Sequence, residues 1–598
     1  MIRKKITPSQ LSLFSRSPVV GAWWNELRVQ GLFKDKLPER NELENQLLKD
    51  GIRHEELLIA NLKKQGYRIA ELGGKQTEID YQSSIDAMAE GYDYIWQASL
   101  NNKEMRGTAD LLEKIKGSSP FGDWTYQPIE CKLSSKTKTT FLVQACCYCE
   151  LLTPILGSKP NNFKLYLGGK NFKEFQTDKF WYWYLHLRER FRDFQNHFDP
   201  DKEPIDIPGD HGDWTAFIDE RLAKSRDLMM VAKMRQTQRL KLKEAGINSI
   251  DDLALLKDGS KVKGLRTEIL NDLKQQAQLQ VSPKGTDGRP NYLLKKIEKD
   301  KGLMLLTKPD EGDIWFDLEG IQDPVLGTQL EYLIGICFKE KDSIRTTYKS
   351  WWAHNALEEK KAFEGWVDWV EKRLEKYPNL KIYHYGSYEK SAIRRIAQQY
   401  STKEAVIDKW LRSNLLVDLL PIVTSTIILG EDSYSIKKVE KLYMDKRDAD
   451  VKTAGDSVVA YRIWANSGEP EIPGKSPTGS PRLQIIEDYN REDCESTERL
   501  QNWLINLKKA EGLTFESHEE EKEDELSQEI KPLESLSKKL LDELPEEYKT
   551  LKSKELNDET FWENKTGKRG LSFRAQLLLS HLLAFHHREN KIDWWNYF

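Results

Sequence analysis

The chain has 598 residues, and its 92 lysine and arginine side chains are balanced by 96 aspartate and glutamate side chains, which gives a formal net charge of −4 at pH 7. This balance excludes a protein that coats nucleic acid with a uniformly basic surface, although a local basic groove is compatible with it. A hydrophobic content of 38% and a charged content of 31% exclude global disorder, and the length exceeds what one core can serve, so we expect a multidomain protein. The helical and strand patterns described below make it an α/β protein.

Targeting signals and cysteines point to the cytoplasm. The segment Met1 to Leu13 has no continuous apolar stretch, and no run approaches the ~20 apolar residues of a membrane helix, so no membrane contact is expected. Six cysteines are too few for a disulfide framework. Cys146, Cys147 and Cys149 could suggest a metal site, but they spread around one helix without a partner at metal-binding spacing, which favours buried thiols.

Residues 1 to 190 show helical patterns around a strand-rich centre, and two of the expected strands carry charged groups. Asp110 lies at the start of the first strand. Twenty residues later, Glu130 and Lys132 lie two residues apart, and therefore on one face of the second strand. Hydrolysis of a phosphodiester needs carboxylates that hold Mg²⁺ or Mn²⁺ and a cation beside the scissile phosphate, so these three residues form a candidate catalytic centre.

Helical segments on both sides extend this set. Gln144 and Tyr148 lie four residues apart on one helical face, and His54 lies in a helix-like segment upstream. Together with Asp110 and Glu130-Cys131-Lys132, these residues resemble the RecB-like branch of the PD-(D/E)xK nucleases over about residues 7 to 190.

The resemblance implies a restriction-endonuclease-like domain over residues 1–190 and a role for each matching residue. Asp110 and Glu130 would hold the metal, and His54 would complete or support that site. Lys132 would position the water or stabilise developing charge. Gln144 and Tyr148 would contact the DNA strand or brace the site. The alternative is that these charges form a buried ion pair in an inactive relic of such a nuclease.

Many relatives of this kind hold an iron-sulfur cluster with four cysteines. The expected places here are occupied by Ser15-Arg16-Ser17-Pro18 and His211-Gly212-Asp213-Trp214. The sequence therefore predicts no iron-sulfur cluster.

Residues 195–300 are polar and helical in pattern. The segment Ala245-Gly246-Ile247-Asn248-Ser249-Ile250 joins two helix-like stretches, and a second glycine follows at Gly264. This arrangement resembles a helix-hairpin-helix, whose backbone amides can face phosphates. A plain helical spacer is the alternative.

Residues 301–512 alternate between expected strands and helices, which favours a mixed-sheet fold. Strands are predicted over Asp313–Leu318, Tyr332–Phe338 and Leu380–Tyr385, and a helix over Ala356–Tyr377. Asp317 and Glu319 lie on one face of the first strand, a common way to present oxygen ligands to metal ions.

A later helix supplies the remaining groups, because Tyr489 and Asp493 lie four residues apart on it. The set resembles the DEDD exonucleases of the RNase H-like fold, in particular their YprB-like branch, over about residues 310 to 507. The resemblance implies that Asp317, Glu319 and Asp493 bind two metals and that Tyr489 orients the attacking water.

The middle motif departs from that family, because Tyr385 and Glu389 stand where many relatives have asparagine and aspartate. Glu389 would then be the fourth acid, and the longer side chain could shift the metal. The site could be active, altered in preference, or retained as a binding scaffold. Asp418 could be a helper acid, but the start of a helix is the preferred interpretation.

The remaining segments are expected to connect rather than catalyse. Residues 513–535 form an acidic linker, and residues 536–598 form a short helical segment whose aromatic end, Asp593 to Phe598, needs cover from another part of the chain or a partner. Gly474-Lys475-Ser476 lacks the spacing and the strand of a P-loop, so no ATP binding is predicted.

The whole organisation resembles bacterial RecB-like proteins that usually continue into a superfamily 1 helicase, and the resemblance implies a separately encoded helicase partner or a truncated longer protein. The leading hypothesis is a metal-dependent nuclease that acts on DNA, with single-stranded DNA favoured, in repair, recombination or defence. The alternatives are a nucleic-acid-binding scaffold with idle sites that recruits a helicase, and an RNA-processing exonuclease that uses the RNase H-like site.

Overall fold

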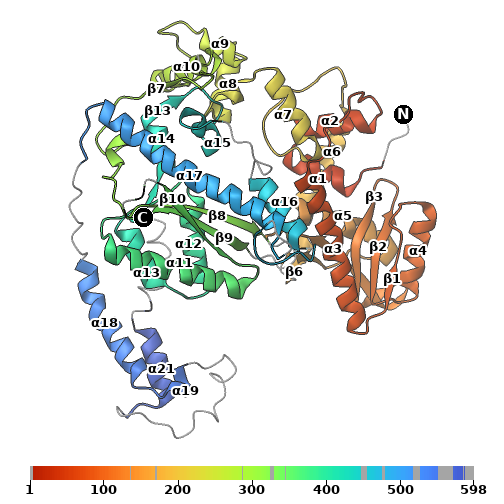
Figure 1. Cartoon of the computed structure of the whole chain (residues 1–598). Helices are drawn as coiled ribbons and strands as arrows, with labels where there is room; N and C mark the ends of the chain where they lie inside the picture. Colours follow the sequence, from red (N-terminus) through yellow and green to blue (C-terminus); the bar gives the residue numbers. More distant parts are fainter. Residues whose placement is uncertain are drawn as a thin grey trace.

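Two mixed sheets with helices on their faces form the two largest parts of the protein (Figure 1), which confirms a multidomain α/β fold. The computed structural model describes residues 5–134, 136–168, 171–285, 287–322, 329–341, 343, 345–445, 454–465, 467–474, 478–515, 525–549, 570–583 and 585. The aromatic end at Asp593 to Phe598 and the pair Lys475-Ser476 lie outside these residues.

The first sheet has six strands in the order of the chain. The pairs β1–β2 and β4–β5 are parallel, and the other neighbours are antiparallel. The strands are β1 (Ile69–Glu71), β2 (Tyr94–Asn101), β3 (Arg106–Ser119), β4 (Gly122–Lys132), β5 (Asn162–Leu167) and β6 (Asn171–Gln176). Asp110 lies four residues inside β3 rather than at its start, while Glu130 and Lys132 lie at the end of β4 as predicted.

Five helices cover this sheet, and side-chain caps define where several of them begin. Asn41 and Glu44 form a reciprocal capping box at the start of α3, and Thr7 and Gln10 do the same for α1. The helices are α1 (Pro8–Arg16), α3 (Glu42–Lys64), α4 (Glu78–Ala89), α5 (Thr139–Leu156) and α6 (Asp178–Asn196).

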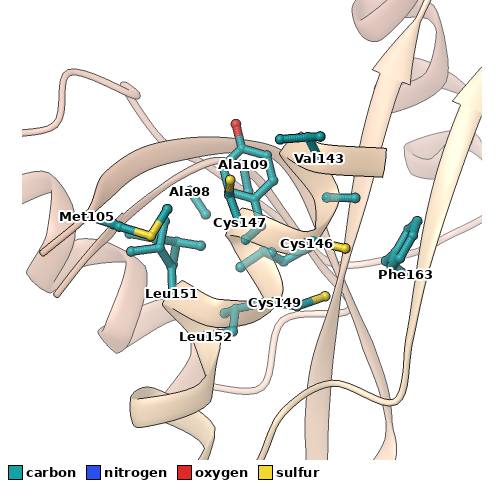
Figure 2. Close-up of a cluster of buried hydrophobic side chains, with 14 of the residues drawn as sticks. Ala98, Met105, Ala109, Val143, Cys146, Cys147, Cys149, Leu151, Leu152 and Phe163 are labelled. Atoms are coloured by element: carbon teal, nitrogen blue, oxygen red, sulfur yellow. The ribbon is translucent and has the colours of Figure 1, made fainter. Parts of the chain in front are cut away.

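Helix α5 lies in the core against the sheet, and Cys146, Cys147 and Cys149 are all fully buried on it. Figure 2 shows the sulfur of Cys147 pointing away from those of the other two, so the buried-thiol interpretation is confirmed. Among the described residues, α5 alone is long and apolar enough to cross a membrane, by its length and composition only. Its apolar character has a structural reason, since its side chains fill the core of the first sheet.

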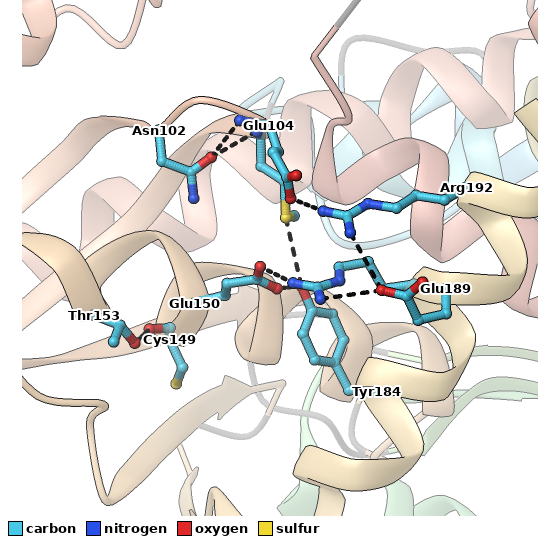
Figure 3. Close-up of polar contacts among 10 residues, drawn as sticks. Asn102, Glu104, Cys149, Glu150, Thr153, Tyr184, Glu189 and Arg192 are labelled. Carbon is cyan, nitrogen blue, oxygen red and sulfur yellow. Dashed lines mark hydrogen bonds and ion pairs between the residues drawn. The ribbon is translucent and has the colours of Figure 1, made fainter. Parts of the chain in front are cut away.

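A polar cluster fastens α6 to α5 (Figure 3). The Glu150 carboxylate on α5 accepts a 2.5 Å hydrogen bond from the Tyr184 hydroxyl on α6 and pairs with Arg188. Arg192, one turn further along α6, pairs with Glu104 in the turn between β2 and β3. These contacts fix the helix that carries Gln144 and Tyr148 relative to strand β3.

The sequence predicted one helical unit over residues 195–300. In the structure, the two ends of this stretch pack against residues outside it. Helix α7 (Thr215–Lys224) packs its aromatic side chains with those of α2 (Val20–Val29), and Trp24 and Trp214 stack at 6.1 Å. At the other end, β7 (Tyr292–Leu294) pairs with β13 (Ile427–Leu429). Only the middle forms a separate helical core.

That middle part contains the predicted helix-turn-helix. Helices α8 (Gln236–Glu244) and α9 (Ile250–Ala254) are joined by a turn in which Gly246 has φ +81°, a conformation that favours glycine, and Ser249 caps α9. Helix α10 (Thr267–Val281) completes the unit.

The second sheet has the strand order β10-β9-β8-β11-β12, with β8–β11 and β11–β12 parallel and the other pairs antiparallel. Its strands are β8 (Ile314–Gln322), β9 (Gln329–Lys339), β10 (Thr346–Trp352), β11 (Ile382–His384) and β12 (Leu416–Asp418). The three strands predicted from the sequence are β8, β9 and β11. The sheet is mixed, as expected.

Helices lie on both sides of this sheet. They are α11 (Ala356–Lys376), α12 (Tyr388–Gln399), α13 (Glu404–Arg412), α14 (Leu419–Thr426), α15 (Ile436–Val439), α16 (Ala454–Ala465) and α17 (Pro481–Ala510). Asp418 accepts a hydrogen bond from the amide of Leu420 and so caps α14, in agreement with its predicted structural role.

Helix α16 joins the two halves of the molecule. Figure 1 shows it between α17 and the helices of the first sheet. Its Arg462 forms an ion pair with Asp50 of α3, and both side chains are largely buried. The two sheets are therefore connected by a direct contact as well as by the chain.

The C-terminal part differs from the prediction of an acidic linker up to residue 535. Helix α18 (Glu525–Asp542) begins before the predicted helical start at residue 536, because the segment after Glu525 regains leucines at helical spacing. It packs on α21 (Phe573–Leu582), with α19 (Glu546–Lys549) beside them, and the group stands apart from the two sheets at the lower left of Figure 1.

Candidate metal centres on the two sheets

Three carboxylates converge at the centre of the second sheet. Asp317 and Glu319 lie on β8, and Asp493 comes from α17, which packs across β8 and β9. One oxygen from each of the three lies within 4.8 Å of the others. The structure therefore brings together the three acids that the sequence separates by more than one hundred and seventy residues.

Burial and mutual repulsion of the ionised carboxylates lower the stability of the folded protein. Burial, followed by the charges of Asp493 and Glu319, holds the pKa of Asp317 well above its usual range. Burial, followed by the charge of Asp493, raises the pKa of Glu319 to about 8. Carboxylates packed in this way favour a bound cation, because a cation offsets the repulsion that the fold imposes.

Asn490 holds Asp317 in place, although the sequence analysis gave it no role. Its Nδ2 donates a 2.8 Å hydrogen bond to Asp317 Oδ2, and its Oδ1 accepts one of 2.8 Å from the Tyr348 hydroxyl. Asn490 is fully buried and lies over Gly335, the residue of β9 that pairs with Asp317. A Cβ at residue 335 would lie 1.6 Å from Asn490 Oδ1, so this strand position accepts only glycine.

We expect the Gly335→Ala substitution to displace Asn490 and release Asp317. The overpacking should cost about 1–3 kcal/mol in the free energy of unfolding and should weaken the metal response of the cluster. Thermal melting with and without Mn²⁺ measures both effects. Gly365→Ala on helix α11 is the matched control, because its Cβ would have only ordinary contacts with Trp351. Equal behaviour of the two variants would contradict the positioning role of Asn490.

Two further polar groups reach the cluster from segments that no motif marked. Ser457 of α16 donates a 2.8 Å hydrogen bond to Glu319 Oε2 and also contacts the Tyr332 hydroxyl at 2.7 Å. Lys437 of α15 places its ammonium 2.5 Å from Asp493 Oδ1 and 4.5 Å from the centre of the Tyr489 ring. A lysine thus provides a positive charge at one edge of the acid cluster.

Glu389 lies close to the cluster but outside the group of three. It is buried at the start of α12, where its charge contributes to the raised pKa of Asp317. Its Oε2 lies 3.4 Å from Nδ1 of the buried His384. Tyr385, at the other position of this motif, donates a hydrogen bond to the backbone of Tyr434 and therefore serves the structure.

The first sheet carries the second centre. Lys132 at the end of β4 forms an ion pair with the buried Glu130, and its Nζ lies 3.6 Å from Asp110 Oδ2 on β3. Asp110 Oδ2 also accepts a 2.8 Å hydrogen bond from the amide of Cys131. The three predicted residues are thus brought together.

Glu55 is a member of this centre that the sequence analysis missed. Its carboxylate on α3 accepts hydrogen bonds from Gln97 Nε2 at 2.8 Å and from Trp96 Nε1 at 3.3 Å. Burial, followed by the charge of Asp110, raises the pKa of Glu55 to about 7, so the two carboxylates repel each other when both are ionised. Gln97 has φ +58° and interrupts the pairing of β2 with β3 opposite Asp110, a strained geometry of the kind that marks functional sites.

His54 is buried on α3, one residue before Glu55. Its ring stacks on Tyr166 with 4.6 Å between centroids, and Tyr166 pairs across the sheet with Cys131. Because side chains alternate along a strand, Cys131 and its partner lie on the opposite face from Glu130. Glu55, the next residue of α3, is the neighbour on which the charge of Asp110 acts, and the metal-supporting role of His54 stays a prediction.

Gln144 and Tyr148 lie on one face of α5, as the spacing predicted. Tyr148 is buried, and burial, followed by the charges of Glu130 and Asp110, holds the pKa of its phenol well above its usual range. Gln144 is partly exposed one turn earlier on the helix. The signal that could have indicated Glu55 is only its position next to His54.

We expect Glu55→Gln to lower cleavage at this centre by on the order of 100-fold, because it removes a charge that faces Asp110 while keeping the side-chain volume. His54→Gln should instead lower the melting temperature through the loss of the Tyr166 stacking and leave the cleavage rate near that of the wild type. Rate assays and thermal melting of both variants test this. A larger rate loss for His54→Gln would assign the site to His54.

Both centres have the donor set of a hard divalent cation. The cluster of Asp317, Glu319 and Asp493 offers only carboxylate oxygens, the ligands that Mg²⁺ and Mn²⁺ prefer. In the first centre, Glu130 Oε2 is buried without a hydrogen bond to any described residue. Such an oxygen is suited to a cation, so the residues present fit a metal at both places.

Residues 314–505 match the family model of the RNase H superfamily. The match begins at the first residue of β8 and ends within α17, and it contains all three acids of the cluster. The chain therefore contains an RNase H-like domain, and this class of domain suggests a nuclease-type, metal-dependent hydrolase. A comparison with curated proteins finds no match.

Proposed function

We propose that the protein is a metal-dependent nuclease that hydrolyses DNA, with single-stranded DNA as the favoured substrate, and that it has two catalytic centres. The observation that carries the proposal is the convergence of Asp317, Glu319 and Asp493 within 4.8 Å inside the RNase H-like domain. Three carboxylates at this distance, of which Glu319 and Asp493 are buried and Asp317 is partly buried, are stable together only with a cation or protons. Divalent cations are the reagents of phosphodiester hydrolysis.

In the RNase H-like domain, these three carboxylates hold Mg²⁺ or Mn²⁺, and Glu389 is the additional acid. The metal supplies Lewis acidity and lowers the pKa of water. Tyr489 lies one helical turn before Asp493 on α17 and orients the attacking water. Asn490 keeps Asp317 directed toward the ion.

The first 190 residues are proposed to be a RecB-like PD-(D/E)xK nuclease domain. Asp110 and Glu130 hold the metal, with Glu55 beside them in place of His54. Lys132, which pairs with Glu130 in the metal-free protein, would be available to the scissile phosphate if Glu130 held a metal. Gln144 and Tyr148 on α5 contact the strand.

The domain organisation supports a wider role that follows from the resemblance. Residues 195–300 act as a helix-hairpin-helix-like element, residues 301–512 form the DEDD exonuclease domain, and the proposed partner is a superfamily 1 helicase encoded separately. Repair, recombination or defence in the cytoplasm is the proposed setting. No ATP or iron-sulfur cluster takes part. The Ser17 hydroxyl lies 2.6 Å from Nδ1 of His211 where related nucleases carry cluster cysteines.

The second candidate function is a nucleic-acid-binding scaffold with an idle RNase H-like site. Lys437 favours it, because its ammonium already pairs with Asp493 and could replace a catalytic cation. Lys437→Met distinguishes the two functions: an active site should show altered cleavage, whereas a scaffold should lose stability without any change in cleavage.

End-labelled single- and double-stranded DNA and RNA, incubated with Mg²⁺ or Mn²⁺, test the proposal. We expect metal-dependent cleavage of single-stranded DNA that EDTA abolishes. Variants at Lys132 and at Asp317 with Glu319 assign each substrate to one centre. Binding without turnover of any substrate would replace the nuclease by the scaffold, and cleavage of RNA alone would assign the activity to an RNA-processing exonuclease.

A further inference from the structure

A cavity of about 310 Å³ lies beside the catalytic strand of the first sheet, between α1, α2 and the turn at Gly212–Trp214. One wall of the cavity is formed by one face of α1. It carries Gln10 and Arg16, together with Thr7, the N-cap of the helix. Water occupies roughly 30 Å³ per molecule in the liquid, so the cavity has room for about ten water molecules. It is therefore large enough for a group of the size of a phosphodiester.

Basic side chains from four segments dominate this cavity. Lys5, Arg16, Arg28 and Arg106 line it together with a single acid, Asp213. Asp213 lies 3.6 Å from Arg40, which offsets its charge from outside the lining. The lining thus has an excess of positive charge.

Three of these four cations have no carboxylate partner among the described residues. Lys5 donates to the side-chain oxygen of Asn101 at 2.5 Å, and Arg28 donates to that of Asn25 at 2.8 Å and lies over the Trp214 ring. Arg106 is exposed at the first position of β3. Only Arg16 is paired, at 3.0 Å from the exposed Asp210. One lysine and two arginines that line the same cavity without a carboxylate partner favour an anionic ligand with several oxygens.

We propose that this cavity binds backbone phosphates of the nucleic-acid strand whose scissile bond lies at Asp110, an inference that rests on the proposed nuclease function. Arg106 and Asp110 are four residues apart on β3, which corresponds to about 13 Å along the strand. A strand held at Arg106 therefore has its next phosphates within reach of Asp110, Glu130 and Lys132. Contacts of this kind position a strand without selecting its sequence.

Binding of a labelled oligothymidine strand of about 30 nucleotides, measured by fluorescence anisotropy in EDTA, tests the site without cleavage. The key variant is Arg28→Gln with Arg106→Gln, and the matched control is Lys173→Gln with Lys179→Gln on the β6 and α6 side of the domain. Arg106→Gln alone is a second variant, because Arg106 is exposed and its loss leaves the Arg28–Trp214 contact intact. Circular dichroism confirms folding, and metal-dependent cleavage is measured in parallel.

Loss of two phosphate contacts should lower the slope of log affinity against log salt by about 1.4 and weaken binding on the order of 25-fold at about 0.1 M salt, with half of that slope change for Arg106→Gln alone. The control pair should bind as the wild type.

Wild-type affinity of the key variant, with cleavage retained, would overturn this inference and leave the nuclease function intact. If the key variant no longer binds inorganic phosphate but still binds the strand as the wild type does, the inference would also be overturned, in favour of a small-anion site. Absence of both binding and cleavage in the wild type would overturn the proposed function itself.

Discussion

The Asp317→Asn substitution is expected to lower metal-dependent cleavage at the RNase H-like centre on the order of 10³-fold and to stabilise the metal-free protein. Removal of one ligand charge forfeits several kcal/mol of charge stabilisation during hydrolysis. The amide keeps the volume of the side chain and can still accept the hydrogen bond from Asn490. The rate loss would therefore report the charge rather than the packing.

Stability should change in the opposite direction for an electrostatic reason. The folded protein holds the pKa of Asp317 well above the value of about 3.9 expected in the unfolded chain. An acid of this kind binds its proton more tightly in the folded state, so its contribution to stability falls as the pH rises above about 4. Asn removes this loss, and we expect a gain of about 1–3 kcal/mol at pH 8.

Thermal melting at pH 5 and pH 8, with and without Mn²⁺, measures these effects. The wild type should gain about 2.7 kcal/mol when Mn²⁺ reaches 100 times its dissociation constant, and Asp317→Asn should gain far less. Asp313→Asn is the matched control. Asp313 is buried just before the same strand and accepts hydrogen bonds from Lys381 and Gln501. Burial is the largest cause that raises the pKa of Asp313, to about 6. A wild-type Mn²⁺ response in Asp317→Asn would remove it from the metal site.

The Lys132→Ala substitution should abolish cleavage at the first centre and, unlike Asp317→Asn, destabilise the protein. Lys132 is the cation that pairs with Glu130, a residue with a side-chain exposure of 1%. Burial, followed by the charge of Asp110, already raises the pKa of Glu130 to about 8 while Lys132 opposes the shift. Loss of the partner of a buried charge costs about 3–5 kcal/mol, and loss of the catalytic cation costs on the order of 10³-fold in rate.

A double variant separates the two effects. Glu130→Gln with Lys132→Met removes both charges and should recover most of the lost stability without any recovery of cleavage. Equilibrium unfolding in urea and single-turnover cleavage provide the two readouts. Unchanged cleavage of single-stranded DNA by Lys132→Ala would move the activity to the RNase H-like centre and leave the first centre as the inactive relic with a buried ion pair.

Local patterns predicted the parts of the fold that depend on local physics. The strands at β8, β9 and β11 and the helix at α11 follow from apolar runs and helical periodicity, and Glu130 and Lys132 share a face because strand side chains alternate. The cluster of Asp317, Glu319 and Asp493 could be proposed because each acid belongs to a recognisable local motif.

The supporting groups could not be predicted in this way, because they come together only in the tertiary structure. Ser457 and Lys437 reach the acid cluster from helices without any motif, and Gly335 matters only because α17 brings Asn490 over it. Glu55 is one of several acidic residues on a helix with many polar residues, and no sequence motif distinguishes it. Its role depends on the strained backbone of Gln97, which sequence periodicity does not encode.

Helix α16 has a practical consequence for any attempt to divide the protein into working fragments. Its Ser457 supports Glu319 in the RNase H-like domain, and its Arg462, five residues or about 7.5 Å further along the helix, pairs with Asp50 of the first domain. Cutting the chain between the domains would leave a largely buried arginine on one fragment and a largely buried aspartate on the other. Point variants in the intact chain are therefore the better way to apportion activity, since separated fragments would lose stability for reasons unrelated to catalysis.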